Sequence, residues 1–227
     1  MIPTRVKVKV CGLTEVRNAL ACVAAGADWI GLNFHPPSPR FIGLDRGAEI
    51  ASALHGKAVA VGLFVDRPID KLIDLLGDLP GLGVVQLHGD EDVGYLERLA
   101  RALPLLKVVR AFRLPDPASI DRMADYIREA EARSCAPHAI LVDAHVAGRL
   151  GGTGHSITPD LLDLLPTHPR LILAGGLTPD NVADRVRRVR PWMVDVASGV
   201  ESSPGYKDPD QVADFIGAAQ DISNNPY

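Results

Sequence analysis

The stretch from residue 171 to residue 219 reads LILAGGLTPDNVADRVRRVRPWMVDVASGVESSPGYKDPDQVADFIGAA, and it contains one pattern twice. A short, largely apolar run at 171–174, and another at 193–197, is followed by a glycine loop. After each loop, apolar residues recur at helical spacing, at 181–189 and at 208–219. Near-continuous apolar runs are typical of strands that are buried on both faces of a parallel sheet. The stretch therefore predicts two consecutive strand–loop–helix units.

The same alternation extends back to the start of the chain. Thr14 is positioned as the N-cap of the first helix. We expect the six earlier strands at 6–10, 29–32, 58–65, 84–87, 106–111 and 139–142, and their helices at 16–24, 45–54, 69–76, 92–102, 118–132 and 158–165. Eight such units predict an α/β chain that forms a single (β/α)8 TIM barrel over residues 1–222, with a polar tail at 223–227. No GxGxxG motif follows the first strand, which argues against a Rossmann fold.

Composition narrows the class of protein. The 227 residues are 47% hydrophobic and 23% charged, which suits a chain with a sizeable core, and the net charge of −4 argues against a nucleic-acid partner. No apolar run approaches the roughly 20 residues of a membrane span, and we see no secretory signal. The three cysteines form no CxxC pair and are odd in number. That usage favours reduced thiols and a cytoplasmic protein.

Glycines follow the last two predicted strands, at Gly175 and Gly176 and again at Ser198-Gly199. In TIM barrels the loops after strands seven and eight commonly bind phosphate, because uncovered backbone N–H groups and a short helix start there. The alternative is that these glycines only make tight turns. Two such loops on neighbouring strands favour the phosphate site.

Three other side chains are placed at strand ends or in the following loops, where TIM barrels carry their active sites. Cys11 ends the first strand, and its alternative role is that of a small buried hydrophobe. Asp143 ends the sixth strand, and its alternative role is a loop cap. Arg40 follows a proline-rich segment and is able to grip a carboxylate bidentately, although most such arginines are solvated surface residues.

Four histidines and one further glycine-rich loop are also predicted near the carboxyl ends of the strands. His35, His88, His145 and His155 all fall near strand ends, but their spacing contains no HExxH motif and no i, i+4 pair. We therefore expect no metal. The loop after Asp143 contains GGTG at 151–154, which suggests a lid that excludes water.

Six short motifs in order resemble those of the phosphoribosylanthranilate isomerase family. They are VKVCGLT at 8–14, SPRF at 38–41, QLHG at 86–89, Asp143 with GGTG at 151–154, LAGGL at 173–177, and DVASGVE at 195–201 followed by Pro204-Gly205, Lys207 and Asp208. Together they cover the chain from residue 8 to about residue 208. Six motifs in register are more specific than any one of them.

The resemblance implies an isomerase of tryptophan biosynthesis. It implies an Amadori rearrangement of N-(5-phosphoribosyl)anthranilate to 1-(2-carboxyphenylamino)-1-deoxyribulose 5-phosphate, without metal or organic cofactor. Cys11 is then the general base at the ribose C2 proton, and Asp143 the general acid at the ring oxygen. Arg40 meets the anthranilate carboxylate. The other expected substrate-binding residues are His88, Gly175, Gly176, Ser198 and Gly199. We expect a small phosphorylated substrate as the only partner, with the chain a monomer or a homodimer.

Two departures from the family pattern are visible. HSITP at 155–159 replaces a Phe-Asp-Trp-like segment, which affects the expectation for loop six, and Ala197 replaces the first serine of a Ser-Ser-Gly sequence. Two other readings stay open. An isomerase of histidine-pathway type generally uses two aspartates, one of them where this chain has Cys11. A non-catalytic phosphate-binding barrel has no need of both proton-transfer groups, Cys11 and Asp143.

The reaction requires a larger pKa shift of Asp143 than of Cys11. A free aspartate has a pKa near ~3.9, so half-protonation at pH 7 requires a shift of ~3 units, or ~4 kcal/mol. Burial and the anionic groups of the substrate act in that direction. For Cys11 we expect that a modest lowering of the thiol pKa is sufficient.

Overall fold

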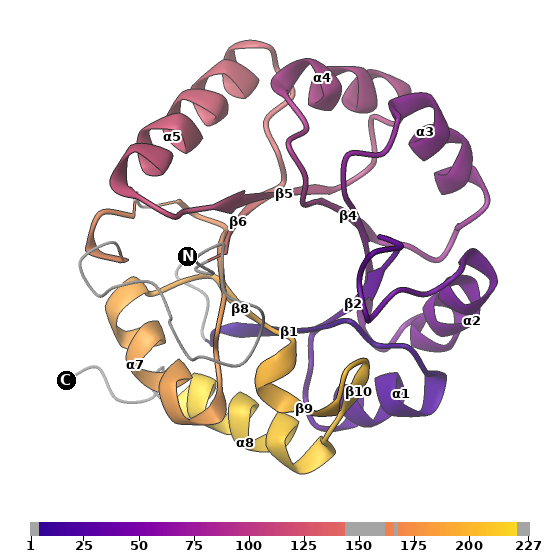
Figure 1. Cartoon of the computed structure of the whole chain (residues 1–227), viewed down its shortest axis with the longest axis vertical. Coiled ribbons are helices and arrows are strands. Elements are labelled where there is room, and N and C mark those ends of the chain that lie inside the picture. The colour runs from indigo at the N-terminus through magenta and orange to yellow at the C-terminus, as the bar shows by residue number, and fades with distance from the viewer. Residues whose placement is uncertain (1–4, 144–161, 166–167, 222–227) are drawn as a thin grey trace.

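The computed structural model describes residues 5–143, 162–165 and 168–221 (Figure 1). Strands and helices alternate along the chain. Their bounds are β1 Lys7–Cys11, α1 Val16–Ala24, β2 Trp29–Asn33, α2 Leu44–Leu54, β3 Val59–Phe64, α3 Ile69–Gly77, β4 Val84–Leu87, α4 Val93–Ala102, β5 Val108–Arg113, α5 Pro117–Ala132, β6 Ala139–Asp143, β7 Leu171–Ala174, α7 Pro179–Val189, β8 Met193–Val196, the 3₁₀ helix η1 Ser198–Val200, β9 Glu201–Ser203, β10 Tyr206–Lys207 and α8 Pro209–Gln220.

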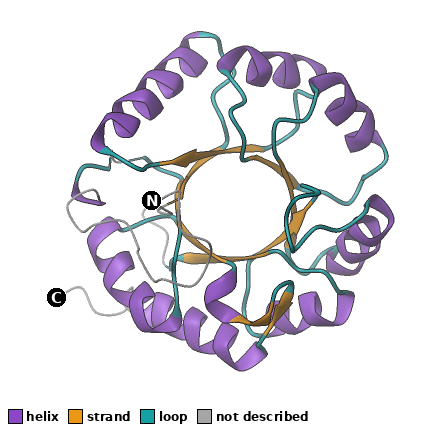
Figure 2. Cartoon of the chain, in the orientation of Figure 1, coloured by secondary structure: helices purple, strands orange, loops and turns teal. Residues whose placement is uncertain are grey.

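Among the described residues, strands β1 to β8 form a closed parallel barrel in sequence order. The barrel closes where β1 pairs with β8, and there Lys9 lies in register with Asp195. Figure 2 shows the strands as an inner ring and the helices as an outer ring around it. The expected (β/α)8 TIM barrel is confirmed. It also brings the carboxyl ends of all these strands to one face.

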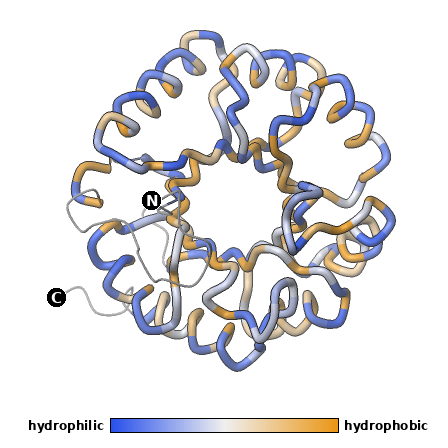
Figure 3. The backbone as a smooth tube through the Cα atoms, viewed as in Figure 1, coloured by the Kyte–Doolittle hydropathy of each residue, from blue (hydrophilic) through white to orange (hydrophobic). Residues whose placement is uncertain are grey.

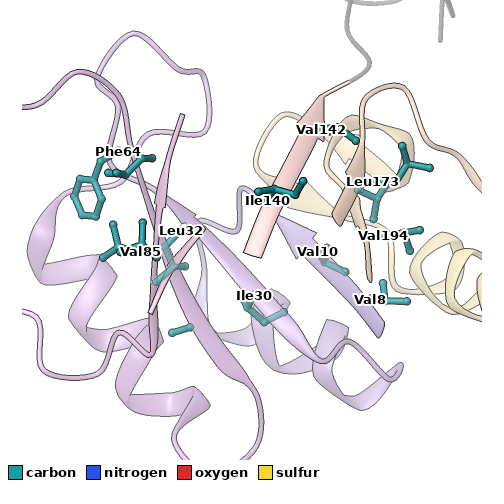
Figure 4. Close-up of a cluster of buried hydrophobic side chains, with 14 of the residues drawn as sticks. Val8, Val10, Ile30, Leu32, Phe64, Val85, Ile140, Val142, Leu173 and Val194 are labelled. Atoms are coloured by element: carbon teal, nitrogen blue, oxygen red, sulfur yellow. The ribbon is translucent and has the colours of Figure 1, made fainter. Parts of the chain in front are cut away.

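Side chains alternate along each strand between the two apolar layers of the barrel. One layer fills the interior and includes Val61, Leu141 and Met193. The other layer lies between the sheet and the helices and includes Val10, Ile30 and Leu173 (Figure 4). The hydropathy colouring of Figure 3 shows apolar residues gathered on the strands and polar residues on the outer helix faces. Because of this alternation, residues two apart on one strand project to the same side.

Several helices begin at aspartates that accept backbone N–H groups. Asp92 accepts from the N–H of Tyr95 at 2.7 Å, and Asp116 accepts from that of Ser119 at 2.7 Å. Such caps typically stabilise a protein by about 1 kcal/mol each. The prediction that Thr14 caps α1 is wrong. Glu15 occupies the N-cap position, and the hydroxyl of Thr14 donates to the carbonyl of Gly205 at 2.9 Å.

The predicted strands β4 and β7 and the predicted helix α1 match the structure residue for residue, and the other described elements differ by one or two residues at one end or at both. The β9–β10 hairpin, which follows η1, was not predicted. Half of the helix expected at 158–165, residues 158–161, lies outside the described residues, and so does the whole tail at 223–227. Over the part of the chain that is described, no helix combines the length and the apolar character needed to cross a bilayer.

Candidate active site

The carboxyl ends of the strands surround a cavity of about 290 Å³. All eight of the predicted site residues line it: Cys11, Arg40, His88, Asp143, Gly175, Gly176, Ser198 and Gly199. Its volume is near the lower end of the roughly 300–1,000 Å³ typical of small-molecule sites. The structure thus brings together, around one space, residues that lie up to 188 positions apart in the sequence.

Cys11 ends β1 with its side chain on the interior face of the barrel, and the absence of a side chain on β2 makes room for it. Cys11 pairs in register with Gly31. A Cβ atom at Gly31 would lie 2.6 Å from the Cys11 Sγ. The glycine therefore permits the thiol to occupy the interior of the barrel beside the cavity.

A buried ion pair lies below the thiol, on the same interior face. Lys9 Nζ donates to Asp195 Oδ2 at 2.7 Å, and the two side chains are 1% and 8% exposed. Burial lowers the pKa of Lys9, but the Asp195 carboxylate, helped by the neighbouring Cys11 side chain, outweighs it, and the net pKa is raised. Burial raises the pKa of Asp195, against the opposing effect of the Lys9 ammonium. The 2.7 Å contact favours the charged form of this pair.

The expected lowering of the Cys11 pKa is not found. Burial raises the pKa of this thiol above its ordinary value, and the cations Lys9 and Lys207 offset only part of that effect. Desolvation disfavours the charged thiolate, because water is a better solvent for it than the barrel interior. The neutral thiol is therefore the main form of Cys11 at neutral pH.

Asp143 ends β6, and its carboxyl group lies close to a histidine that follows β4. The Asp143 Oδ2 lies 3.5 Å from the His88 Nε2. On the other side of the ring, His88 Nδ1 lies 2.8 Å from the Gln86 Nε2. The backbone carbonyl of His88 accepts from Arg113 at 2.9 Å. Gln86 thus holds the imidazole ring beside the carboxyl group, and Arg113 holds the backbone of His88.

The two glycine loops approach each other closely at the mouth. Gly175 and Gly176 have φ angles of +92° and +63°, a region that favours glycine. Within the described chain, neither of their N–H groups donates a hydrogen bond. A Cβ atom at Gly199 would lie 1.9 Å from the carbonyl oxygen of Leu177. The loops therefore need these glycines both for backbone conformation and for close contact.

The Arg40 guanidinium binds a carboxylate within the protein, that of Glu201. Its Nε and Nη2 donate to Glu201 at 2.7 Å and 2.6 Å. These hydrogen bonds raise the pKa of Arg40. Arg40 is therefore a partly buried, partnered residue and not the solvated surface arginine of the alternative reading.

Some expected features fall elsewhere. His35 lines a different cavity of about 370 Å³, between the loops that follow β2 and β3. His145, His155 and the expected lid at 151–154 lie outside the described residues. Among residues that are described, no group of three or more potential metal ligands is placed to hold an ion.

Sequence reasoning gave no role to the polar residues inside the strands, Lys9, Gln86 and Asp195, although all three lie in motifs of the family resemblance. The signal that identifies them is their position. Each lies two residues before a strand end or a rim residue, on the interior face. It also gave no role to Glu201 and Lys207, although both lie in a quoted motif.

Comparisons with known proteins agree with this geometry. The family model described as N-(5'phosphoribosyl)anthranilate (PRA) isomerase matches residues 8–218. A curated relative of that name from Geotalea uraniireducens is 42% identical over 216 residues, covering 95% of this chain and 99% of the relative.

Solved structures of isomerases with this name also superpose on the chain. A phosphoribosyl anthranilate isomerase from Thermotoga maritima superposes with a TM-score of 0.81 at 33% identity, covering 94% and 98% of the two chains. Another isomerase structure, with a TM-score of 0.75 at 31% identity and the same coverage, is a complex with reduced 1-(o-carboxyphenylamino)-1-deoxyribulose 5-phosphate. That compound is called the reduced product analogue below.

Proposed function

The chain belongs to the N-(5'-phosphoribosyl)anthranilate isomerase family, and from this premise we propose how its residues carry out the isomerisation. The activity is the isomerisation step of tryptophan biosynthesis. In our proposal Asp143 is the general acid and Cys11 the general base. The observation that carries this assignment is that both side chains line one cavity together with the two glycine loops and Arg40.

The phosphate of the substrate binds to the backbone of the two loops. Gly175 and Gly176 present N–H groups that donate to no described residue, and the first N–H groups of η1 have no partner within that helix. Oriented backbone N–H groups are well suited to an anion. Asn181 fixes the first loop, since its Nδ2 donates to the Gly176 carbonyl at 2.9 Å. The phosphate thus anchors one end of the ribose.

Asp143 supplies the proton for ring opening. The proton goes to the ring oxygen, the bond from that oxygen to C1 breaks, and the nitrogen lone pair forms a C1=N iminium. The two anionic groups of the bound substrate favour the neutral, protonated form of a carboxyl group nearby. His88, whose Nε2 lies 3.5 Å from the Asp143 Oδ2, positions the carboxyl group.

Cys11 then removes the proton from C2. The electrons of that C–H bond form a C1=C2 double bond and neutralise the iminium. The resulting enol becomes the ketone of the product when C1 gains a proton and the hydroxyl on C2 loses one. Burial disfavours the thiolate in the free enzyme. The iminium cation, formed one bond from the reacting carbon, is an opposite charge that favours the thiolate at the moment it is needed. The Lys9 ammonium acts in the same direction.

Asp195 provides a further contact to the sugar. Its Oδ2 is held by Lys9, but its Oδ1 is buried and accepts no hydrogen bond from the described residues. Asp195 lines the cavity. A buried oxygen without a donor is costly, and a ribose hydroxyl is a donor of the right kind. We therefore assign Asp195 a hydroxyl group of the substrate.

A solved relative from Thermotoga maritima consists of monomers generated from a dimeric isomerase, at 32% identity and a TM-score of 0.77. The chain accordingly works as a monomer or a homodimer. The three described cysteines are free and buried, which suits a reducing cytoplasm.

The test is the loss of fluorescence of N-(5-phosphoribosyl)anthranilate when enzyme is added. We expect the fluorescence to decay, and we expect no turnover of a histidine-pathway aminoaldose. Decay only with the histidine-pathway substrate would support that isomerase instead. Tight binding of the reduced product analogue without any decay would indicate a non-catalytic barrel.

A further inference from the structure

Glu201 joins two cations at the mouth, and nothing in the proposed reaction uses it. It is the first residue of β9, directly after η1, and its side chain is 6% exposed. Its Oε1 accepts from Lys207 Nζ at 2.6 Å, from Arg40 Nε at 2.7 Å and from the N–H of Gly205 at 3.0 Å. Its Oε2 accepts from Arg40 Nη2 at 2.6 Å. Both carboxylate oxygens are therefore committed within the protein.

The contact with Glu201 determines which edge of Arg40 is left for a ligand. A guanidinium has five N–H donors in one plane, and a carboxylate binds bidentately to two that are parallel. Glu201 occupies the edge formed by Nε and Nη2. The edge formed by Nη1 and the second hydrogen of Nη2 is the other bidentate edge. A substrate carboxylate is thus limited to one orientation at Arg40.

The Glu201 carboxylate also connects Arg40, through Lys207, to the loop after β8 that binds the phosphate in our proposal. Lys207, which is fully buried, donates from Nζ to Glu201 and also to the carbonyl of Ala197 at 3.0 Å. Ala197 immediately precedes Ser198 and Gly199. The chain of contacts therefore runs from the loop after β2, through Glu201 and Lys207, to the loop that binds phosphate. It fixes the separation between the two anionic ends of a bound substrate.

The charges of Arg40, Lys207 and Glu201 also suit the binding of one substrate carboxylate. Arg40 and Lys207 carry two positive charges and Glu201 one negative charge, so the group keeps a single net positive charge. Burial alone would raise the pKa of Glu201, but the hydrogen bonds from Arg40, Lys207 and Gly205 outweigh it, and the pKa is lowered. Glu201 is therefore ionised at neutral pH. One net positive charge matches one substrate carboxylate.

We propose that Glu201 is a positioning residue that acts through Arg40, turning the free edge of the guanidinium toward the carboxylate of the aromatic ring. The inference rests on the proposed contact between Arg40 and that carboxylate. A purely structural role, in which Glu201 only neutralises Lys207 and holds the hairpin, makes a different prediction. It implies that loss of Glu201 weakens every ligand alike.

The experiment compares two ligands, the reduced product analogue and the same compound with phenyl in place of carboxyphenyl. The ratio of their dissociation constants is called the carboxylate preference. In Glu201→Gln, an amide NH₂ must face one of the guanidinium donors, so the bidentate contact is lost. We expect the carboxylate preference to fall about tenfold, since charge-assisted bidentate contacts are strong. The KM for the natural substrate should rise by a similar factor, and kcat should stay within about threefold.

A double-mutant cycle separates the two roles. Arg40→Met should abolish the carboxylate preference, and adding Glu201→Gln to Arg40→Met should change it less than twofold. Glu49→Gln is the matched control, because Glu49 pairs with Arg46 on the exposed face of α2. It should leave the preference and turnover unchanged. If Glu201→Gln does not fold, Glu201→Asp provides the same test, because its side chain keeps the charge but is one methylene shorter, which withdraws the carboxylate from the Arg40 donors.

The outcomes are distinct. If Arg40→Met keeps the carboxylate preference, the proposed contact of Arg40 is wrong, and the positioning role is wrong with it. If Arg40→Met removes the preference but Glu201→Gln, or Glu201→Asp in its place, leaves it intact, only the positioning role is overturned. Equal weakening of both ligands in Glu201→Gln would also overturn it, in favour of a structural role.

Discussion

Replacing Gly199 with alanine should strongly reduce kcat/KM while leaving most of the fold intact. The added Cβ would lie 1.9 Å from the Leu177 carbonyl oxygen, 1.1 Å short of the 3.0 Å below which such contacts are essentially absent from proteins. The nearest neighbours of this Cβ would be backbone atoms of Leu177 and Thr178, which cannot rotate away. The two phosphate-binding loops must therefore separate by about 1 Å.

A displacement of about 1 Å in substrate-positioning groups can reduce the rate by ~10²-fold. We expect kcat/KM of Gly199→Ala to fall by about that factor, with the affinity for the reduced product analogue falling in parallel because the phosphate contacts are lost. The assay is the fluorescence decay of the substrate over a range of concentrations. Binding of the analogue by titration gives the second value.

Gly217→Ala is the matched control. Gly217 lies inside α8, and a Cβ there would meet no atom within 4 Å. Alanine is favoured over glycine in a helix by up to about 1 kcal/mol, so this variant should be slightly more stable and fully active. If Gly199→Ala instead keeps kcat/KM within about threefold of the wild type, the loops do not hold the phosphate in the way described.

Two further predictions concern the interior of the barrel. Burial raises the pKa of the Cys11 thiol above its ordinary value, and the thiolate is the reactive form. Inactivation by iodoacetamide should therefore accelerate about tenfold per pH unit above pH 7. A rate that is flat above pH 7 would show a lowered pKa instead. Lys9→Met should cost about 3 kcal/mol of unfolding free energy in urea at pH 7, because it leaves Asp195 buried without its cation. Arg98→Met removes an exposed pair with Asp70 and should cost less than about 1 kcal/mol; equal losses in the two variants would contradict the argument.

The fold was accessible from the sequence because its signal is periodic and repeated. Each strand is a short apolar run and each helix carries an apolar stripe, so errors at single boundaries did not affect the order of elements. The wrong cap at Thr14 has a tertiary cause. Its hydroxyl bonds the carbonyl of Gly205, 191 residues away, which no local pattern reveals.

Some residues around the cavity are likewise revealed by a local sequence pattern, and others only by the folded chain. Cys11 and Asp143 were predictable because a polar side chain at the end of an apolar run stands out. The roles of Lys9 and Asp195 depend on barrel closure, which puts β1 beside β8 and the two residues in register. The contact between Arg40 and Glu201 joins residues 161 positions apart, and only the folded chain shows which carboxylate the guanidinium meets.

The central claim is that Cys11 and Asp143 transfer the protons of the isomerisation. The most direct measurement is the turnover of Cys11→Ala and Asp143→Ala with N-(5-phosphoribosyl)anthranilate, made on protein that still binds the reduced product analogue within about threefold of the wild-type affinity. The account predicts a loss of ~10²-fold or more in kcat for each variant. Turnover close to that of the wild type in both variants would contradict it.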